Sequence, residues 1–236
     1  MRIAVLSDIH GFSIALQRVL DDLAARDVDR TLVAGDLCEG GPDPAGVLQL
    51  VREAGAECVY GNNDRDLVAG ERSRSIDWTR EQIGPDGVAF LRDLPFSIRV
   101  PRPGAEANRE ADLLVVHANP TDVDRHLSPN ASDREIREII GNEPAQTIAF
   151  GHLHVAYTRD VDGTTLVDVS AVGNPRDGDL RPRYAIFEDA GGRWTSAMHY
   201  IEYPLDKTRD QMERSGMPNW RKAYDRLVAA TYNRPV

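Results

Sequence analysis

The stretch Arg2-Ile3-Ala4-Val5-Leu6-Ser7-Asp8-Ile9-His10-Gly11 joins an apolar run to a short polar segment. The run 2–6 has the length and apolar content of a buried strand. Asp8 and His10 are two residues apart, so their side chains can approach one metal only where the strand has ended and the chain turns. Gly11 permits such a turn. Alone, this spacing is a weak signal, because a polar loop after a strand would look the same.

Four further segments place the same kinds of side chain after apolar runs. They are Gly35-Asp36, Gly61-Asn62-Asn63-Asp64, Val115-Val116-His117 and Gly151-His152-Leu153-His154. Taken singly, Asp36 could be a turn or helix cap, Asn62 a turn residue, and each histidine a structural residue. Together they bring Asp, Asn and His to the ends of several strands, which indicates a metal site. Because a carboxylate has two oxygens, Asp36 is the natural ligand to bridge two cations.

The order of predicted elements indicates the fold class. Strands are predicted at 2–6, 31–34 and 57–60, with amphipathic helices at 13–25 and 44–54 between them. This β-α-β-α-β order predicts a parallel sheet whose ligands collect at the C-terminal strand ends. Further strands are expected at 95–100, 113–116, 147–150, 164–169, 184–187 and 194–201, with a mostly helical segment at 66–94. We expect a single domain over 1–236, in which two packed sheets are flanked by helices and a helical tail occupies about 206–236.

Composition excludes several classes of protein. The chain has 236 residues, of which 41% are hydrophobic and 28% charged, as in a globular protein. No apolar stretch approaches the roughly 20 residues of a membrane span, and no signal peptide precedes the first strand, so we expect a cytoplasmic protein without a membrane partner. The net charge of -10 disfavours binding of nucleic acid to a basic face. It does not disfavour a phosphoester substrate, because metal cations can supply the local positive field.

The ordered set of motifs resembles the calcineurin-like metallophosphoesterases. The resemblance covers residues 1 to about 180 and rests on Asp-x-His, Gly-Asp, Gly-Asn-x-Asp, His and Gly-His-x-His, in that order. It is greatest to the small bacterial phosphoesterase branch, where a helix like Trp78-Thr79 and a loop like 172–179 also occur. The resemblance implies an α/β fold: a four-layer α-β-β-α sandwich of two mixed sheets, with a dinuclear metal site at the C-terminal strand ends.

The resemblance also implies a ligand set and a reaction. One metal would take Asp8, His10 and His154, the other Asn62, His117 and His152, and Asp36 would bridge them. This mixed ligation suits two divalent transition metals, with manganese preferred and iron or zinc as alternatives, better than calcium. The predicted function is a hydrolase that cleaves a phosphate mono- or diester by attack of the hydroxide that the two metals share.

Two positions complicate this prediction. The family commonly has a histidine where Asn63 stands, and Asn63 can donate a hydrogen bond but no proton at neutral pH. We predict catalytic roles for Asn63 and Asp64 and a substrate contact for Asn63. Arg176 is predicted to bind a substrate phosphate, although pairing with Asp177 or Asp179 at the surface fits the sequence equally well.

Two kinds of function remain open. The leading one is a metal-dependent phosphodiesterase or phosphatase. The alternative is a catalytically idle, metal-bound scaffold that binds phosphorylated partners, which the absence of a proton donor at Asn63 permits. Retention of every expected metal ligand favours the enzyme. The sequence identifies neither the substrate nor its mono- or diester character, and it leaves open whether the chain forms a homo-oligomer.

Overall fold

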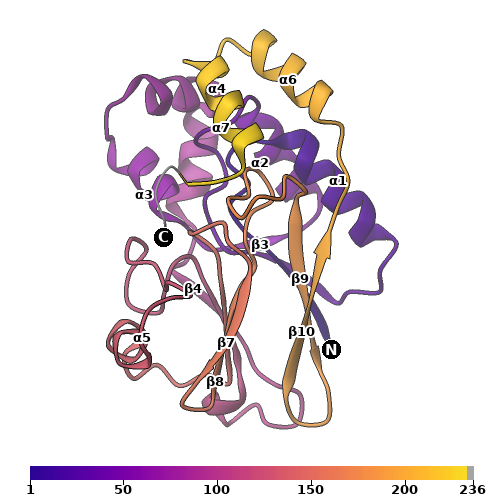
Figure 1. The fold of residues 1–236 in the computed structure, drawn as a ribbon, viewed down its shortest axis with the longest axis vertical. Coiled ribbons are helices and arrows are strands. Elements are labelled where there is room, and N and C mark those ends of the chain that lie inside the picture. Colours follow the sequence, from indigo (N-terminus) through magenta and orange to yellow (C-terminus); the bar gives the residue numbers. More distant parts are fainter. Residues whose placement is uncertain (233–236) are drawn as a thin grey trace.

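Two five-stranded sheets pack face to face in the computed structural model, which describes residues 1–232 (Figure 1). The first has the order β10-β9-β1-β2-β3, built from β1 (Arg2–Leu6), β2 (Arg30–Val33), β3 (Glu57–Cys58), β9 (Arg183–Asp189) and β10 (Trp194–Tyr200). The second has the order β4-β5-β6-β8-β7, built from β4 (Ser97–Val100), β5 (Leu113–Val116), β6 (Thr147–Phe150), β7 (Tyr157–Val161) and β8 (Thr164–Asp168). Both sheets are mixed, because parallel trios (β1-β2-β3 and β5-β6-β8) are bordered by antiparallel strands.

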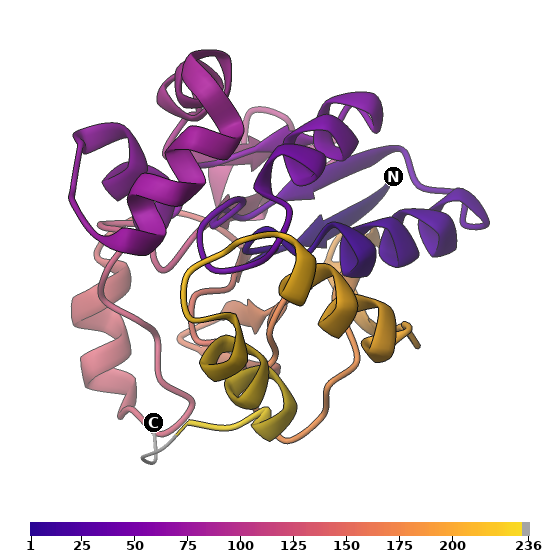
Figure 2. The same cartoon turned by 90° about the horizontal axis from the view of Figure 1, so that it is seen from above.

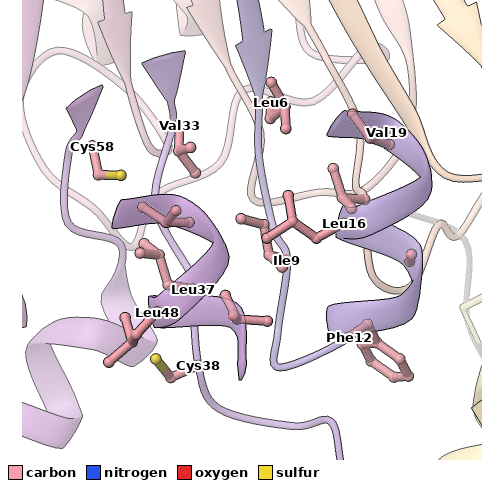
Figure 3. Packing of buried hydrophobic residues seen from close by; sticks show 14 of the residues in the cluster. Leu6, Ile9, Phe12, Leu16, Val19, Val33, Leu37, Cys38, Leu48 and Cys58 are labelled. Atoms are coloured by element: carbon pink, nitrogen blue, oxygen red, sulfur yellow. The ribbon is translucent and has the colours of Figure 1, made fainter. Parts of the chain in front are cut away.

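Alternation along the strands divides the core into layers. In β1, Ile3 and Val5 face the second sheet, while Ala4 and Leu6 face the helices α1 (Ser13–Ala24) and α2 (Pro44–Glu53). Figure 3 shows this outer layer, with Leu16 and Val19 of α1 lying against the strands. On the opposite side, α5 (Asp133–Ile140) covers the second sheet with a row of isoleucines. The predicted four-layer α-β-β-α sandwich is confirmed.

Two elements differ from the sequence prediction. The strand β7 was not predicted, because it is an edge strand whose Thr158 and Asp160 are exposed and whose inward residues are only partly apolar. The helix α5, which begins at Asp133, was not predicted either. The predicted helical segment at 66–94 consists of α3 (Asn62–Ala69) and α4 (Arg74–Arg92), and α4 is kinked where Gly84 leaves the helical conformation.

The C-terminal helices lie over the end of the sheets to which the parallel strands point (Figure 2). They are α6 (Leu205–Arg214) and α7 (Trp220–Ala229), and the rest of the predicted tail, 233–236, lies outside the described residues. The two helices are here called the C-terminal hairpin. Gln211 of α6 donates hydrogen bonds to Ser13 Oγ (3.1 Å) and Asp43 Oδ2 (3.2 Å), which link the hairpin to α1 and to the N-terminus of α2. No helix within residues 1–232 is long and apolar enough to cross a membrane.

Candidate metal centre

The structure brings all seven predicted ligands to the C-terminal ends of five strands. Asp8 and His10 follow β1, Asp36 follows β2, Asn62 begins α3 after β3, His117 follows β5, and His152 and His154 follow β6. Five of the seven are buried, whereas Asn62 and His152 are only partly so. The cluster is therefore enclosed by the sheets and open on the side of Asn62 and His152.

One set of ligand atoms comes from Asp8, His10 and His154. The Nε2 atom of His154 lies 3.0 Å from Asp8 Oδ1 and 3.2 Å from His10 Nε2, and His10 Nε2 lies 3.5 Å from Asp8 Oδ1. Two ligand atoms about 2.1 Å from one metal, at angles of roughly 90–109°, stand about 3.0–3.4 Å apart. The three atoms have the mutual spacing that one transition metal requires.

A second set comes from Asn62, His117 and His152. Asn62 Oδ1 lies 3.0 Å from His117 Nε2 and 3.1 Å from His152 Nδ1, and the two nitrogens are 3.2 Å apart. Asp36 lies between the two sets, because its Oδ2 is 3.7 Å from His10 Nε2 and 3.6 Å from His117 Nε2. The geometry divides the ligands into two triads that share one carboxylate.

Backbone carbonyls orient the four imidazoles. His10 Nδ1 is 2.7 Å from the Glu39 carbonyl oxygen, and the matching nitrogens of His117 and His154 are 2.8 Å and 2.9 Å from the carbonyls of Ala34 and Asn174. His152 is reversed, since its Nε2 lies 2.9 Å from the Asp124 carbonyl. A carbonyl only accepts, so each of these nitrogens is the donor and the other ring nitrogen of a neutral imidazole turns its lone pair into the cluster.

The buried carboxylate of Asp8 gives a direct test of whether a cation fits. Its Oδ2 accepts hydrogen bonds from Ser7 Oγ (2.7 Å) and His152 N (2.8 Å), but its Oδ1 is buried without a hydrogen-bond partner. That oxygen lies 3.0 Å from His154 Nε2, and when the imidazole is neutral with Nδ1 as its donor, two acceptors oppose each other. Leaving a buried oxygen in this state is costly, and a cation between the two acceptors would satisfy both.

The electrostatics of the cluster also favour positive charge. Burial would raise the pKa of Asp8, but His154 and His10 hold the pKa of that carboxyl well below its usual range. Burial disfavours a charged His10, yet the carboxylates of Asp8 and Asp36 raise the pKa of its imidazole to about 9. Burial and the neighbouring His117 lower the pKa of His152, which keeps its ring neutral as a ligand must be. The residues present therefore fit divalent metals.

The backbone at the cluster is in a conformation that L-residues seldom adopt. Positive φ angles occur at five of the seven ligands, namely Asp8 (52°), His10 (50°), Asp36 (55°), His152 (72°) and His154 (59°). Each such residue carries a conformational cost of order 1–3 kcal/mol that the surrounding structure must offset. The sharp turns that result bring side chains separated by one residue onto the same cluster.

Glycine is required where two of these turns meet. A Cβ at Gly151 would collide with Ser7 Oγ and Asp8 Oδ2, and a Cβ at Gly61 would collide with the Asp36 carboxylate. The glycines in the Gly-His-x-His and Gly-Asn segments therefore allow neighbouring turns to approach the ligands.

Asn63 and Asp64 both contact the Asp36 turn. Asn63 donates its backbone N–H to Asp36 Oδ1 (2.9 Å) and its side-chain amide to Asp36 Oδ2. Asp64 is fully buried, and its carboxylate accepts hydrogen bonds from Asp36 N (2.8 Å), Leu37 N (3.0 Å) and Gly61 N (3.0 Å). These contacts let Asp64 hold two ligand-bearing turns together, and its predicted catalytic role stays a prediction.

Replacing Asp64 with alanine should lower the free energy of unfolding by about 3–5 kcal/mol, because three buried backbone N–H groups would lose their acceptor. Urea denaturation of the metal-free protein measures the change. Asp66→Ala is the matched control, since Asp66 lies on the same helix but pairs with Arg65 at the surface, where such pairs contribute about 0–1 kcal/mol. Equal losses in the two variants would contradict the positioning role.

Arg176 does not pair with Asp177 or Asp179, which was one of the two alternatives that its sequence allowed. Its predicted surface partners are engaged elsewhere, because Asp177 pairs with Arg183 and Asp179 pairs with Arg181. Arg176 itself donates from Nη1 to the Arg226 carbonyl oxygen at 2.8 Å and forms no ion pair within residues 1–232. Its side chain lines a cavity that His10 also lines.

Sequence reasoning did not identify several groups that shape the cluster. Ser7 directly precedes Asp8 and supports its carboxylate, which its position in the first motif could have suggested. The carbonyls of Ala34, Glu39, Asp124 and Asn174 carry no residue-type signal, because any amino acid supplies one. The cationic residues of α7 that approach the same cavity belong to a helix outside every motif.

Known proteins are similar to this chain in sequence and in fold. The chain is 25% identical over 243 residues to an uncharacterised protein of Methanocaldococcus jannaschii, covering 92% of this chain and 94% of that protein. The crystal structure of a metallophosphoesterase from Sphaerobacter thermophilus has a TM-score of 0.78 and 28% sequence identity, covering 98% of this chain and 100% of that one. A symmetrical bis(5'-nucleosyl)-tetraphosphatase of Erwinia tasmaniensis is 28% identical over 142 residues, which span 59% of this chain and 52% of that enzyme.

A family model describes most of the chain. The model of the calcineurin-like phosphoesterase superfamily domain matches residues 1–191, which include all seven ligands and every strand of the second sheet. The matched region ends before α6 and α7, so the C-terminal hairpin lies outside it. The motif order, the α-β-β-α sandwich and this match lead to one conclusion: the chain belongs to the calcineurin-like phosphoesterase superfamily.

Proposed function

We propose that this protein is a metal-dependent phosphoesterase that hydrolyses a phosphate mono- or diester with two divalent metals, preferably manganese. The observation that carries the proposal is the pair of ligand triads sharing Asp36 Oδ2, which lies 3.7 Å and 3.6 Å from His10 Nε2 and His117 Nε2. Family membership supports hydrolysis of phosphoester bonds. The ligand set of imidazole, carboxylate and one amide oxygen suits manganese, iron or zinc.

The residues of the metal centre would have different roles in this reaction. Asp8, His10 and His154 would hold one metal, Asn62, His117 and His152 would hold the other, and Asp36 would contact both. When bound, such a metal pair polarises phosphoryl oxygens and lowers the pKa of water towards neutrality. The backbone carbonyls hold the imidazole lone pairs in place, and the Asp64 carboxylate holds the Asp36 turn. Because these groups are already held in position, they need not reorganise during the reaction.

A substrate panel tests the proposal. Aryl and alkyl phosphomonoesters, phosphodiesters and dinucleoside polyphosphates would be assayed with added Mn²⁺ and again after removal of metal by a chelator. The proposal requires turnover of at least one class that depends on metal. Absence of turnover in every class, with both metals bound, would instead favour the idle scaffold.

A further inference from the structure

A cavity of about 350 Å³ adjoins the metal centre beneath α7. It is lined by His10 on one side and by the side chains of Arg176, Lys222 and Arg226 on the other. A second cavity of about 540 Å³ is lined by the same three cationic residues, by Tyr232 and by the acidic Asp225. Arg176, Lys222 and Arg226, here called the cationic triad, therefore line both cavities, and the first cavity is also lined by the metal ligand His10.

Three cationic residues face two carboxylates around the cavities, because Asp225 lines the second cavity and Glu39 lines the first one. Glu39 is the only acidic residue that lines the first cavity, and its contact to the cluster is the backbone carbonyl that orients His10. Within residues 1–232, Arg176, Lys222 and Arg226 form no ion pair, although most arginines of the chain do. Such a local concentration of positive charge in a chain of net charge -10 indicates a site for an anion.

The three side chains are held near one another by the backbone. Arg176 donates to the Arg226 carbonyl oxygen at 2.8 Å, and Gly178 N donates to the Ala230 carbonyl at 2.8 Å. Burial, together with the nearby positive charge of Arg226, lowers the pKa of Arg176. Lys222 and Arg226 are four residues apart on α7 and so lie on the same face of the helix. Like charges gathered in this way repel one another unless an anion lies between them.

We propose that the cationic triad binds a second phosphate group of the substrate while the first phosphate lies at the metal centre. The inference rests on the proposed phosphoesterase function and narrows its substrates to polyphosphorylated small molecules, in which a further phosphate lies within a few ångströms of the scissile one. Arginine binds phosphate through paired N–H donors, and lysine adds a point charge. Lys222 and Arg226 lie on α7, outside the family match, whereas Arg176 lies inside it, so α7 then contributes to the selection of the substrate.

The test compares two substrates that differ in the number of phosphates. Diadenosine tetraphosphate carries several, and bis(4-nitrophenyl) phosphate carries one. The double variant Lys222→Gln/Arg226→Gln should lower kcat/KM for diadenosine tetraphosphate by about 10–100-fold, chiefly through KM, because two charged contacts are lost. It should change kcat/KM for bis(4-nitrophenyl) phosphate by less than about twofold, because the metal ligands are untouched. Both residues are exposed, so the variant should fold.

Lys207→Gln/Arg209→Gln is the matched control, since it removes the same charge from α6, and Lys207 is the other of the two lysines in the sequence. The control should leave both substrates unaffected. Equal loss for the two substrates, or no loss for either, would overturn the inference. If the wild type with both metals turns over neither substrate nor any other class of the substrate panel, the proposed function fails, and calorimetric binding of adenosine 5'-tetraphosphate tests the inference separately. Equal affinity in wild type and variant would then overturn it.

Discussion

Replacing Asp36 with asparagine should remove metal and nearly all phosphoesterase activity together. Asp36 Oδ2 faces both ligand triads, and a neutral amide oxygen is a poor bridge between two cations. We expect turnover of 4-nitrophenyl phosphate to fall by about 10³-fold or more, since the preorganised charge of the site is lost. Elemental analysis and kinetics on the same preparation measure both quantities.

A matched substitution separates this effect from a general loss of charge. Asp66→Asn makes the same chemical change at a surface residue that pairs with Arg65, and it should keep both metals and full activity. Thermal unfolding of the two metal-free variants shows whether Asp36→Asn still folds. Normal metal content with normal turnover in Asp36→Asn would mean that Asp36 does not bridge the metals.

Asn63 should make the rate depend steeply on the leaving group. No imidazole stands at this position to protonate the departing oxygen, and the side-chain amide of Asn63 contacts Asp36 instead. General-acid catalysis typically contributes about 10²–10⁴-fold, so aryl esters should turn over faster than alkyl phosphomonoesters by a factor of that order. Asn63→His should narrow the gap by accelerating the alkyl ester most, whereas Asn63→Ala adds no acid and should leave the gap unchanged.

Equal rates for aryl and alkyl esters in the wild type would contradict this account of Asn63. Another acid would then act at the site, and the structure identifies the first residue to test. His126 is exposed, and its ring centroid lies 6.3 Å from that of the ligand His152. His126→Gln should leave both rates unchanged if the enzyme works without a general acid, and it should slow alkyl esters selectively if His126 supplies the proton.

The sequence predicts those strands whose residues are nearly all buried. The runs 2–6, 113–116 and 147–150 are apolar except for Arg2 and Thr147, and they match β1, β5 and β6 residue for residue. The strand β7 lies at a sheet edge with exposed polar residues, so its sequence lacks that signal. The sequence of α5 does carry a signal for a helix, because Ser132 and Glu135 form a capping box ahead of Ile136 and Ile139. This helix was missed because its first turn is polar and a search for apolar runs does not detect it.

The candidate site could be predicted in its residue types but not in its geometry. Motif order indicated the seven ligands, because their chemistry is unusual at strand ends. The positive φ angles of Asp8 and His154, and the reversed orientation of His152, depend on contacts between turns that are far apart in the chain. The cavity that Lys222 and His10 both line likewise depends on how α6 and α7 dock, which no local pattern describes.

Anomalous X-ray diffraction from crystals soaked in Mn²⁺ tests the central claim most directly, because it locates each metal independently of activity. The account predicts two strong peaks about 3.5–4 Å apart on either side of Asp36. One peak should contact Nε2 of His10 and His154, and the other Nε2 of His117 and Nδ1 of His152. A single peak, or peaks away from these nitrogens at saturating Mn²⁺, would contradict a dinuclear centre bridged by Asp36.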